Sequence, residues 1–238
     1  MKKLTILVLA TMFSFTVASA EIGLRIGVSG AVGVYETSGS EKDVGLDETD
    51  TNKATDSNEL LVGLGSIFIE KTLEFLPGPL GRLSVGYDYV PYDINTGSQS
   101  RTDTDLDGDL AVIEAEGSNA DIIVRSASAT VSDINTLYLT LNVTDWLYVK
   151  GGMTEMDVKS GDSNSLDGTS GYGSISLDGT TYGVGVMGQN EAGFGFKLAY
   201  EYTDIDGGTL NHKTNANNSI TIDSVEGYVG KVSVYKAF

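Results

Sequence analysis

Residues 21–35 read EIGLRIGVSGAVGVY, and their apolar residues fall on every second position. One parity carries glycine, serine, alanine and a single arginine. The other parity is the apolar set Ile22, Leu24, Ile26, Val28, Val32 and Val34. A period of two over so long a run predicts a β-strand with one apolar face and one small or polar face.

The same alternation recurs in RLSVGYDYV (82–90) and in GFGFKLAYEYT (193–203). The composition agrees, because 30 glycines and 3 prolines disfavour helices. Less regular stretches complete the pattern. The chain is predicted to contain eight strands, at 21–35, 59–72, 82–91, 121–141, 146–157, 174–188, 193–204 and 219–238.

The connections between these strands alternate strictly between short and long. The short ones are 74–81, 142–145 and 190–192. The long, mostly polar ones are 36–58, 92–120, 158–173 and 205–218. Short turns at one end and long loops at the other are typical of an outer-membrane barrel. The sequence therefore predicts one all-β domain, 21–238, folded as an eight-stranded antiparallel up-and-down transmembrane β-barrel.

The residues of the small, polar parity argue against a soluble secreted β-sandwich, which is the alternative all-β fold. A sandwich exposes lysine, glutamate, threonine and serine on its outward parity. Here that parity holds mostly glycine, alanine and serine with scattered charges of both signs, which suits the narrow lumen of an eight-stranded barrel. The expected lumen charge network consists of Arg25, Asp88, Lys150, Lys197, Glu201 and Lys231.

Two strands leave their inward parity open. In LLVGLGSIFIEK (60–71) both parities are apolar, so either Glu70 or Lys71 points inward. In 121–141, Asp133 and Asn135 share the parity of Leu137, which is otherwise lipid-facing. Either that strand projects above the bilayer there, or a β-bulge resets its register.

Residues 1–20 read MKKLTILVLATMFSFTVASA, with two lysines, an apolar stretch and a small-residue cleavage site. They predict a secretory signal peptide cut before Glu21; the alternative is a retained anchor helix. No later stretch approaches 18 consecutive apolar residues, so no transmembrane helix is expected.

Charge and cysteine content narrow the function classes. The 33 acidic residues against 15 basic ones give a formal net charge of −18. Such a surface repels nucleic acid and attracts metal cations. Cysteine is absent, so disulfides contribute nothing to the stability of this exported chain.

The C-terminal stretch EGYVGKVSVYKAF (226–238) ends in phenylalanine, and the residues on its parity are Tyr228, Val232, Val234 and Phe238. With the strand and loop pattern, it resembles the small outer-membrane barrels of Gram-negative bacteria, of the OmpA-barrel, OmpX and opacity-protein type. One departure is Lys236, third from the end, where such barrels commonly have tyrosine. A shared architecture says little about activity.

The resemblance implies an outer-membrane location, with the loops facing the exterior. It also implies that the chain is a monomer and that its partners are outer-membrane lipid and lipopolysaccharide. The same set of four C-terminal residues would then be the signal read by the barrel assembly machinery.

Catalysis is not expected. Enzymes on this scaffold, such as lipid A acylases and deacylases, use a histidine with a nearby serine and carboxylate. The chain has one histidine, His212, in the polar segment LNHKTN, and it has no cysteine nucleophile. A histidine in such a loop is more often a solvated polar residue than a base.

The stretch DTDLDGDLAVIE (103–114) fits the spacing of an EF-hand calcium loop. Its ligands would be Asp103, Asp105, Asp107, the carbonyl of Asp109, and Glu114. In a hairpin arm each residue advances about 3.3 Å, which carries Glu114 away from the aspartates. The options are weak Ca²⁺ binding, with a Kd of about 10⁻⁴ to 10⁻³ M, and a solvated acidic loop. No other cofactor is expected.

The sequence favours a non-enzymatic outer-membrane barrel with acidic surface loops and a role in envelope structure or surface interaction. The alternative is a porin-like passive channel for ions or small solutes. Side chains just fill a lumen of eight strands, so a channel requires more strands or a lateral opening. A soluble Ca²⁺-dependent adhesin is the third reading.

Overall fold

The computed structural model describes residues 23–44, 51–103, 123–161, 163–164, 172–213 and 218–238. Its elements are β1 (Leu24–Val44), β2 (Thr51–Thr72), the 3₁₀ helix η1 (Gly78–Arg82), β3 (Leu83–Tyr89), β4 (Ile94–Asp103), β5 (Ile123–Asn142), β6 (Leu147–Ser160), β7 (Ser163–Asn164), β8 (Ser174–Gln189), β9 (Phe194–Ile205), β10 (Gly208–Asn211) and β11 (Ser219–Ala237). Among these residues there is no helix with the length and apolar character to cross a membrane.

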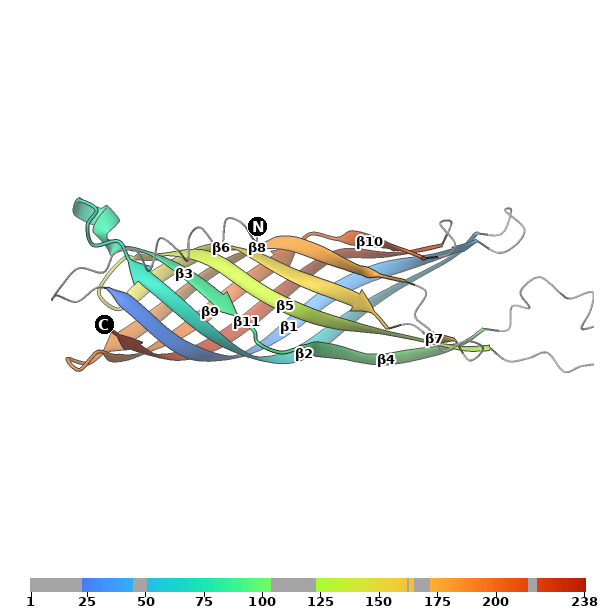
Figure 1. Cartoon of the computed structure of the whole chain (residues 1–238), viewed down its shortest axis with the longest axis horizontal. Helices are drawn as coiled ribbons and strands as arrows, with labels where there is room; N and C mark the ends of the chain where they lie inside the picture. The colour runs from blue at the N-terminus through green and yellow to red at the C-terminus, as the bar shows by residue number, and fades with distance from the viewer. Residues whose placement is uncertain (1–22, 45–50, 104–122, 162, 165–171, 214–217) are drawn as a thin grey trace, which may run out of the picture.

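Eight strands form a closed antiparallel ring in the order β1-β2-β3-β5-β6-β8-β9-β11, and β11 pairs back with β1 (Figure 1). This confirms the predicted eight-stranded up-and-down barrel. The short connections lie together at one end, called the turn end below, and the opposite end is called the loop end. The three short strands extend the wall toward the loop end, where β4 and β7 pair with β5 and β10 pairs with β11.

The strands are strongly staggered around the ring. A row of directly paired residues starts at Arg25 on β1, runs through Glu70, Gly86 and Tyr138, and continues across the other four strands. It returns to β1 at Tyr35, ten residues beyond its start. Such a stagger implies strands tilted by roughly 40° to the barrel axis.

The outer face is apolar over a band of membrane thickness. Its exposed residues include Ile26, Val28, Val32, Leu61, Ile67, Leu139, Val149, Val184, Leu198, Val232 and Val234. Toward the turn end the band meets the exposed rings of Trp146, Phe194, Phe196 and Phe238, and toward the loop end those of Tyr182, Tyr200 and Tyr228. An exposed apolar band between aromatic girdles is the surface of a transmembrane barrel.

The length of β9 agrees with that assignment. Phe194, at its turn end, and Asp204, near its loop end, are ten residues apart. That separation is about 33 Å along the strand, or roughly 25 Å along the axis at the tilt given above. The apolar band of an outer-membrane barrel is about 25 Å tall.

The long loops are shorter than predicted, because the strands run on past the apolar band. β1 and β2 stay paired as far as Val44 and Thr51, inside the predicted loop 36–58. Likewise 92–120 contains β4, 158–173 contains β7 and the end of β6, and 205–218 contains β10. Backbone pairing does not depend on apolar side chains, so polar segments continue the ladder. The predicted signal peptide lies outside the described residues.

A β-bulge resolves the open parity of β5. The pairing of β5 with β6 shifts between Ser132 and Asn135, and Asp133 has a φ of 52°. On the turn side of this point Tyr138 and Thr140 are buried in the lumen. On the loop side Val131, of the opposite parity, packs into the interior. The extra residue reverses the inward parity, which is the second of the two alternatives given above.

The wall is interrupted between β2 and β4. β3 pairs with β2 only as far as Tyr89, and in the described part of the chain β4 pairs with β5 alone. Pro91 lies at the break, and it has no N–H to offer a neighbouring strand. The hydroxyl of Tyr92 accepts the N–H of Gly65 on β2, so one side chain bridges part of the gap.

Candidate functional site in the barrel interior

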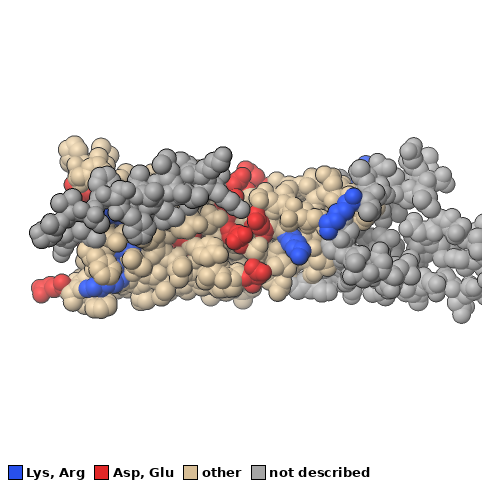
Figure 2. All heavy atoms as spheres, viewed as in Figure 1, with Lys and Arg blue, Asp and Glu red and all other residues tan. Residues whose placement is uncertain are grey.

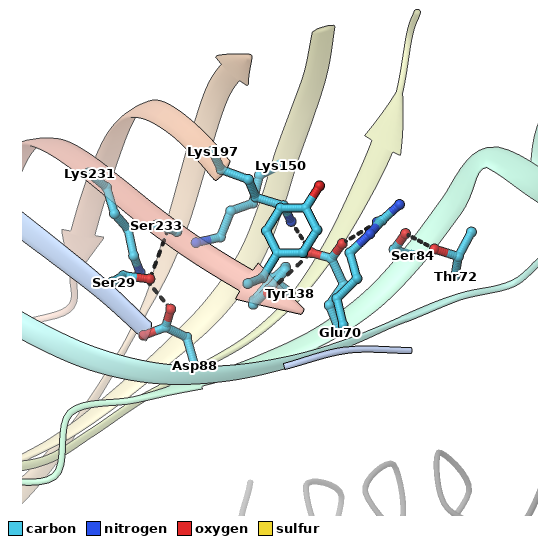
Figure 3. Close-up of polar contacts among 12 residues, drawn as sticks. Ser29, Glu70, Thr72, Ser84, Asp88, Tyr138, Lys150, Lys197, Lys231 and Ser233 are labelled. Carbon is cyan, nitrogen blue, oxygen red and sulfur yellow. Dashed lines mark hydrogen bonds and ion pairs between the residues drawn. The ribbon is translucent and has the colours of Figure 1, made fainter. Parts of the chain in front are cut away.

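The interior is built around one carboxylate, Glu70 of β2, whose side chain is fully buried. Arg25 of β1 donates to its Oε1 at 2.8 Å, and Lys197 of β9 donates to its Oε2 at 2.6 Å. The hydroxyl of Tyr138 on β5 also donates to Oε2, at 3.2 Å. Four strands are therefore joined at one carboxylate (Figure 3). A buried carboxylate is tolerable only with such partners.

Two further ion pairs cross the lumen. Lys150 of β6 reaches Glu201 of β9 at 2.8 Å, and Lys231 of β11 reaches Asp88 of β3 at 2.6 Å. Neither pair joins neighbouring strands in the ring. Figure 3 shows Lys231 and Asp88 pointing toward one another, and Lys197 reaching toward Glu70.

Aromatic rings surround the lysines. The ammonium of Lys150 lies 4.5 Å from the ring centre of Tyr138. That of Lys197 lies 5.3 Å from Tyr148 and 5.5 Å from Phe68. A cation over an aromatic face is attracted by the ring quadrupole, more strongly where water is excluded. The rings therefore help to hold these charges inside the barrel.

The interior is layered along the axis. An apolar cluster lies at the turn end; its members are Phe68, Tyr148, Met187 and Tyr235. The ion-paired residues described above, called the charged layer, project into this cluster. Beyond the charges, toward the loop end, four threonine hydroxyls of β5, β6, β8 and β9 form a hydrogen-bonded chain with distances of 2.8 to 3.0 Å; its members are Thr136, Thr154, Thr181 and Thr203. A second apolar cluster follows: Met156, Val158, Leu177 and Ile205.

The turn end opens into a hollow of about 340 Å³. Its lining is Gly23, Arg25, Glu74, Gln189, Glu191, Ala192, Gly193, Ala237 and Phe238. Arg25 is the only member of this lining that belongs to the charged layer. The hollow therefore ends at the ion pairs and includes none of the residues beyond them.

The structure places all six residues of the expected lumen network inside the ring. It joins Lys150 to Glu201 and Lys231 to Asp88, and it directs Arg25 and Lys197 to Glu70 instead. Sequence reasoning missed Glu70 and Tyr138 as members. The signal for Glu70 is its register, because it lies directly opposite Arg25 when β1 and β2 pair.

The other predicted sites lie elsewhere. Tyr228, Val232 and Val234 are exposed on the outer face of β11, and Phe238 follows its end; recognition by the assembly machinery stays a prediction. Tyr235, one place off that parity, turns into the lumen. Its hydroxyl donates to the carbonyl of Gly188 at 3.4 Å.

His212 lies just beyond β10, with its ring centre 5.1 Å from that of Tyr172. In the calcium stretch, Asp103 is the last residue of β4, while Asp105, Asp107, Asp109 and Glu114 lie outside the described residues. Calcium binding by this stretch therefore stays a prediction.

No family model and no curated protein matches the chain. Among solved structures it is similar to Ail, the attachment invasion locus protein of Yersinia pestis, at 14% identity over 89% of this chain and 99% of that one, with a TM-score of 0.34. It is also similar to the outer membrane protease OmpT of Escherichia coli, at 12% identity over 94% of this chain and 99% of that one, with a TM-score of 0.43. The outer membrane protein OprG of Pseudomonas aeruginosa matches at 12% identity over 92% of this chain and 98% of its own, with a TM-score of 0.46. These similarities say nothing about the biochemical role of this chain.

Proposed function

We propose that the protein is a closed, non-enzymatic barrel of the Gram-negative outer membrane, with its loop end facing the exterior. Its role is in envelope structure or surface interaction. The observation that carries this is the set of ion pairs across the lumen, Glu70–Lys197, Lys150–Glu201 and Lys231–Asp88. They block the axis between the turn-end hollow and the loop-end apolar cluster.

The proposed outer-membrane barrel also implies which molecules contact it. Its apolar band contacts outer-membrane lipid, and its loop end meets lipopolysaccharide. Closure of the ring through β1 and β11 supports a monomer, because both strands use their edges within one chain. The exposed outer residues of β11 are available to the barrel assembly machinery before the ring closes.

Planar-bilayer recording tests the closed lumen. Purified, folded protein is expected to give no steady conductance steps, because fixed ion pairs and packed rings leave ions no axial path. A bacterial porin inserted in the same membrane shows that the assay works. Uniform steps from the folded protein, absent after it is unfolded by heat, would contradict the proposal.

A passive channel is the second candidate, and the gap between β2 and β4 favours it. The gap begins beyond Tyr89, within the apolar part of the wall, and the Tyr92 side chain bridges part of it. If that side chain moved aside, a solute could leave the lumen sideways there. Such a path ends in hydrocarbon, so it suits small apolar solutes rather than ions. Uptake of such a solute into protein-containing vesicles that show no conductance would favour it.

A further inference from the structure

Carboxylates gather on the outer face where the apolar band ends toward the loop end. We call six of them the carboxylate girdle: Glu36 on β1, Glu59 on β2, Glu155 on β6, Asp178 on β8, Asp204 on β9 and Glu226 on β11. They face outward because their strand neighbours, such as Leu177 and Ile205, are buried inside. Figure 2 shows acidic side chains gathered in a narrow zone across one face.

The register places like charges side by side in this girdle. Glu36 lies directly opposite both Glu59 and Glu226, and Glu226 lies directly opposite Asp204. Like charges in such positions destabilise a sheet. The ion pairs formed among the described residues include no member of the girdle.

Glu155 supplies an independent sign of a ligand. It lies directly opposite Asp178, yet only 8% of its surface is exposed. Its Oε2 is buried and has no hydrogen-bond partner. A buried carboxylate oxygen without a donor or cation is costly, and native structures rarely leave one unsatisfied. The facing group is also an acid and supplies no donor, whereas a cation would satisfy both carboxylates.

The coordination that the girdle offers is incomplete. Within the described residues, no three acidic or histidine side chains converge closely enough to hold a metal ion. Mg²⁺ is commonly bound by one or two carboxylates, while waters and phosphate oxygens complete its shell. The girdle lies beside Tyr182 and Tyr228, at the level where an aromatic girdle marks the membrane boundary. Lipid phosphates lie at that level.

We infer that the carboxylate girdle binds divalent cations, Mg²⁺ or Ca²⁺, and shares them with the phosphate groups of the surrounding lipid. This rests on the proposed membrane orientation. The shared ions remove the repulsion between neighbouring carboxylates and between the acidic wall and an anionic lipid surface. Binding here requires no calcium loop and involves no residue of the lumen.

Thermal unfolding of the full chain in phosphatidylglycerol vesicles tests this, with Mg²⁺ compared with KCl at equal ionic strength. The girdle variant carries Glu36→Gln, Glu155→Gln, Asp178→Asn and Glu226→Gln. The control carries Glu74→Gln and Glu191→Gln, two exposed acids at the turn end. Wild type and control are expected to gain about 5 °C in Tm from Mg²⁺, and the girdle variant less than about a third of that gain.

Chelator gives a second readout. Without divalent ions the girdle variant is expected to melt above the wild type, because its like charges are gone. Equal Mg²⁺ gains in variant and wild type, or equal gains from KCl, would overturn the inference. An undiminished gain in phosphate-free maltoside micelles would overturn the sharing with lipid. Conductance recording is independent of these results, so a failure of the closed-lumen proposal is recognised separately.

Discussion

Replacing Glu70 with alanine is expected to lower the free energy of unfolding by about 3–5 kcal/mol, the usual cost of removing one partner from a buried ion pair. Glu70 is fully buried and holds both Arg25 and Lys197. Its loss leaves the Lys197 ammonium unpaired among aromatic rings. Urea unfolding of the protein in detergent, followed by the gel mobility of the folded barrel, measures the effect.

The matched control is Glu74→Gln, an exposed acid in the turn that follows β2. It is expected to change stability by no more than about 0.5 kcal/mol. A double variant, Glu70→Gln with Lys197→Met, is expected to recover part of the loss, because it removes both charges. A Glu70→Ala protein as stable as the control would show that the carboxylate does not organise the lumen.

Replacing Gly86 with alanine is expected to cost about 1–3 kcal/mol, the range for overpacking a filled interior. In the register Gly86 lies between Glu70 and Tyr138, and the Tyr138 ring passes over it to reach the carboxylate. A Cβ at Gly86 would lie 2.2 Å from Cζ of that ring. Either the ring or its strand must move, which weakens the hydrogen bond to Glu70.

Gly30→Ala is the control for this substitution. Gly30 lies on the outer face of β1, and a Cβ there meets nothing within 4 Å. The same urea titration is expected to show little change for Gly30→Ala and a clear loss for Gly86→Ala. Equal behaviour of the two variants would mean that the lumen has free space beside Tyr138.

The sidedness of the barrel could be predicted from sequence, because alternation in β1, β3 and β9 is nearly complete. Arg25, Asp88 and Lys197 each lie among small residues of one parity. Strand count and closure followed from the same alternation and from the spacing of the connections. The choice of ion partners could not be predicted, because it depends on the stagger of ten residues around the ring.

Other features depended on three-dimensional context. Both parities of β2 are apolar near Glu70, because Phe68 lines the lumen while Ile67 faces outward. The bulge at Asp133 reverses the parity of β5, and alternation alone does not reveal on which residue the reversal falls. The polar ends of β1 and β2 pair through their backbones, which side-chain patterns do not report.

The carboxylate girdle was missed for a similar reason. Its members are scattered over six strands and become neighbours only when those strands pair in register. Glu36 and Glu226 meet only where β11 closes the ring on β1. If the lumen is closed as proposed, the protein contacts ions, lipids and other molecules only through its outer face and its loop end. The girdle lies where these two surfaces meet.

The central claim is that the apolar parity faces lipid and the small, charged parity faces inward. Relaxation of side-chain methyl signals by nitroxides on the lipid acyl chains tests it without altering the chain. Leu198 and Val232, on the outer face, are expected to be strongly broadened, while Ala199 and Val229, their inward counterparts on the same strands, keep their signals. Broadening of Ala199 and Val229 with sparing of Leu198 and Val232 would contradict the account.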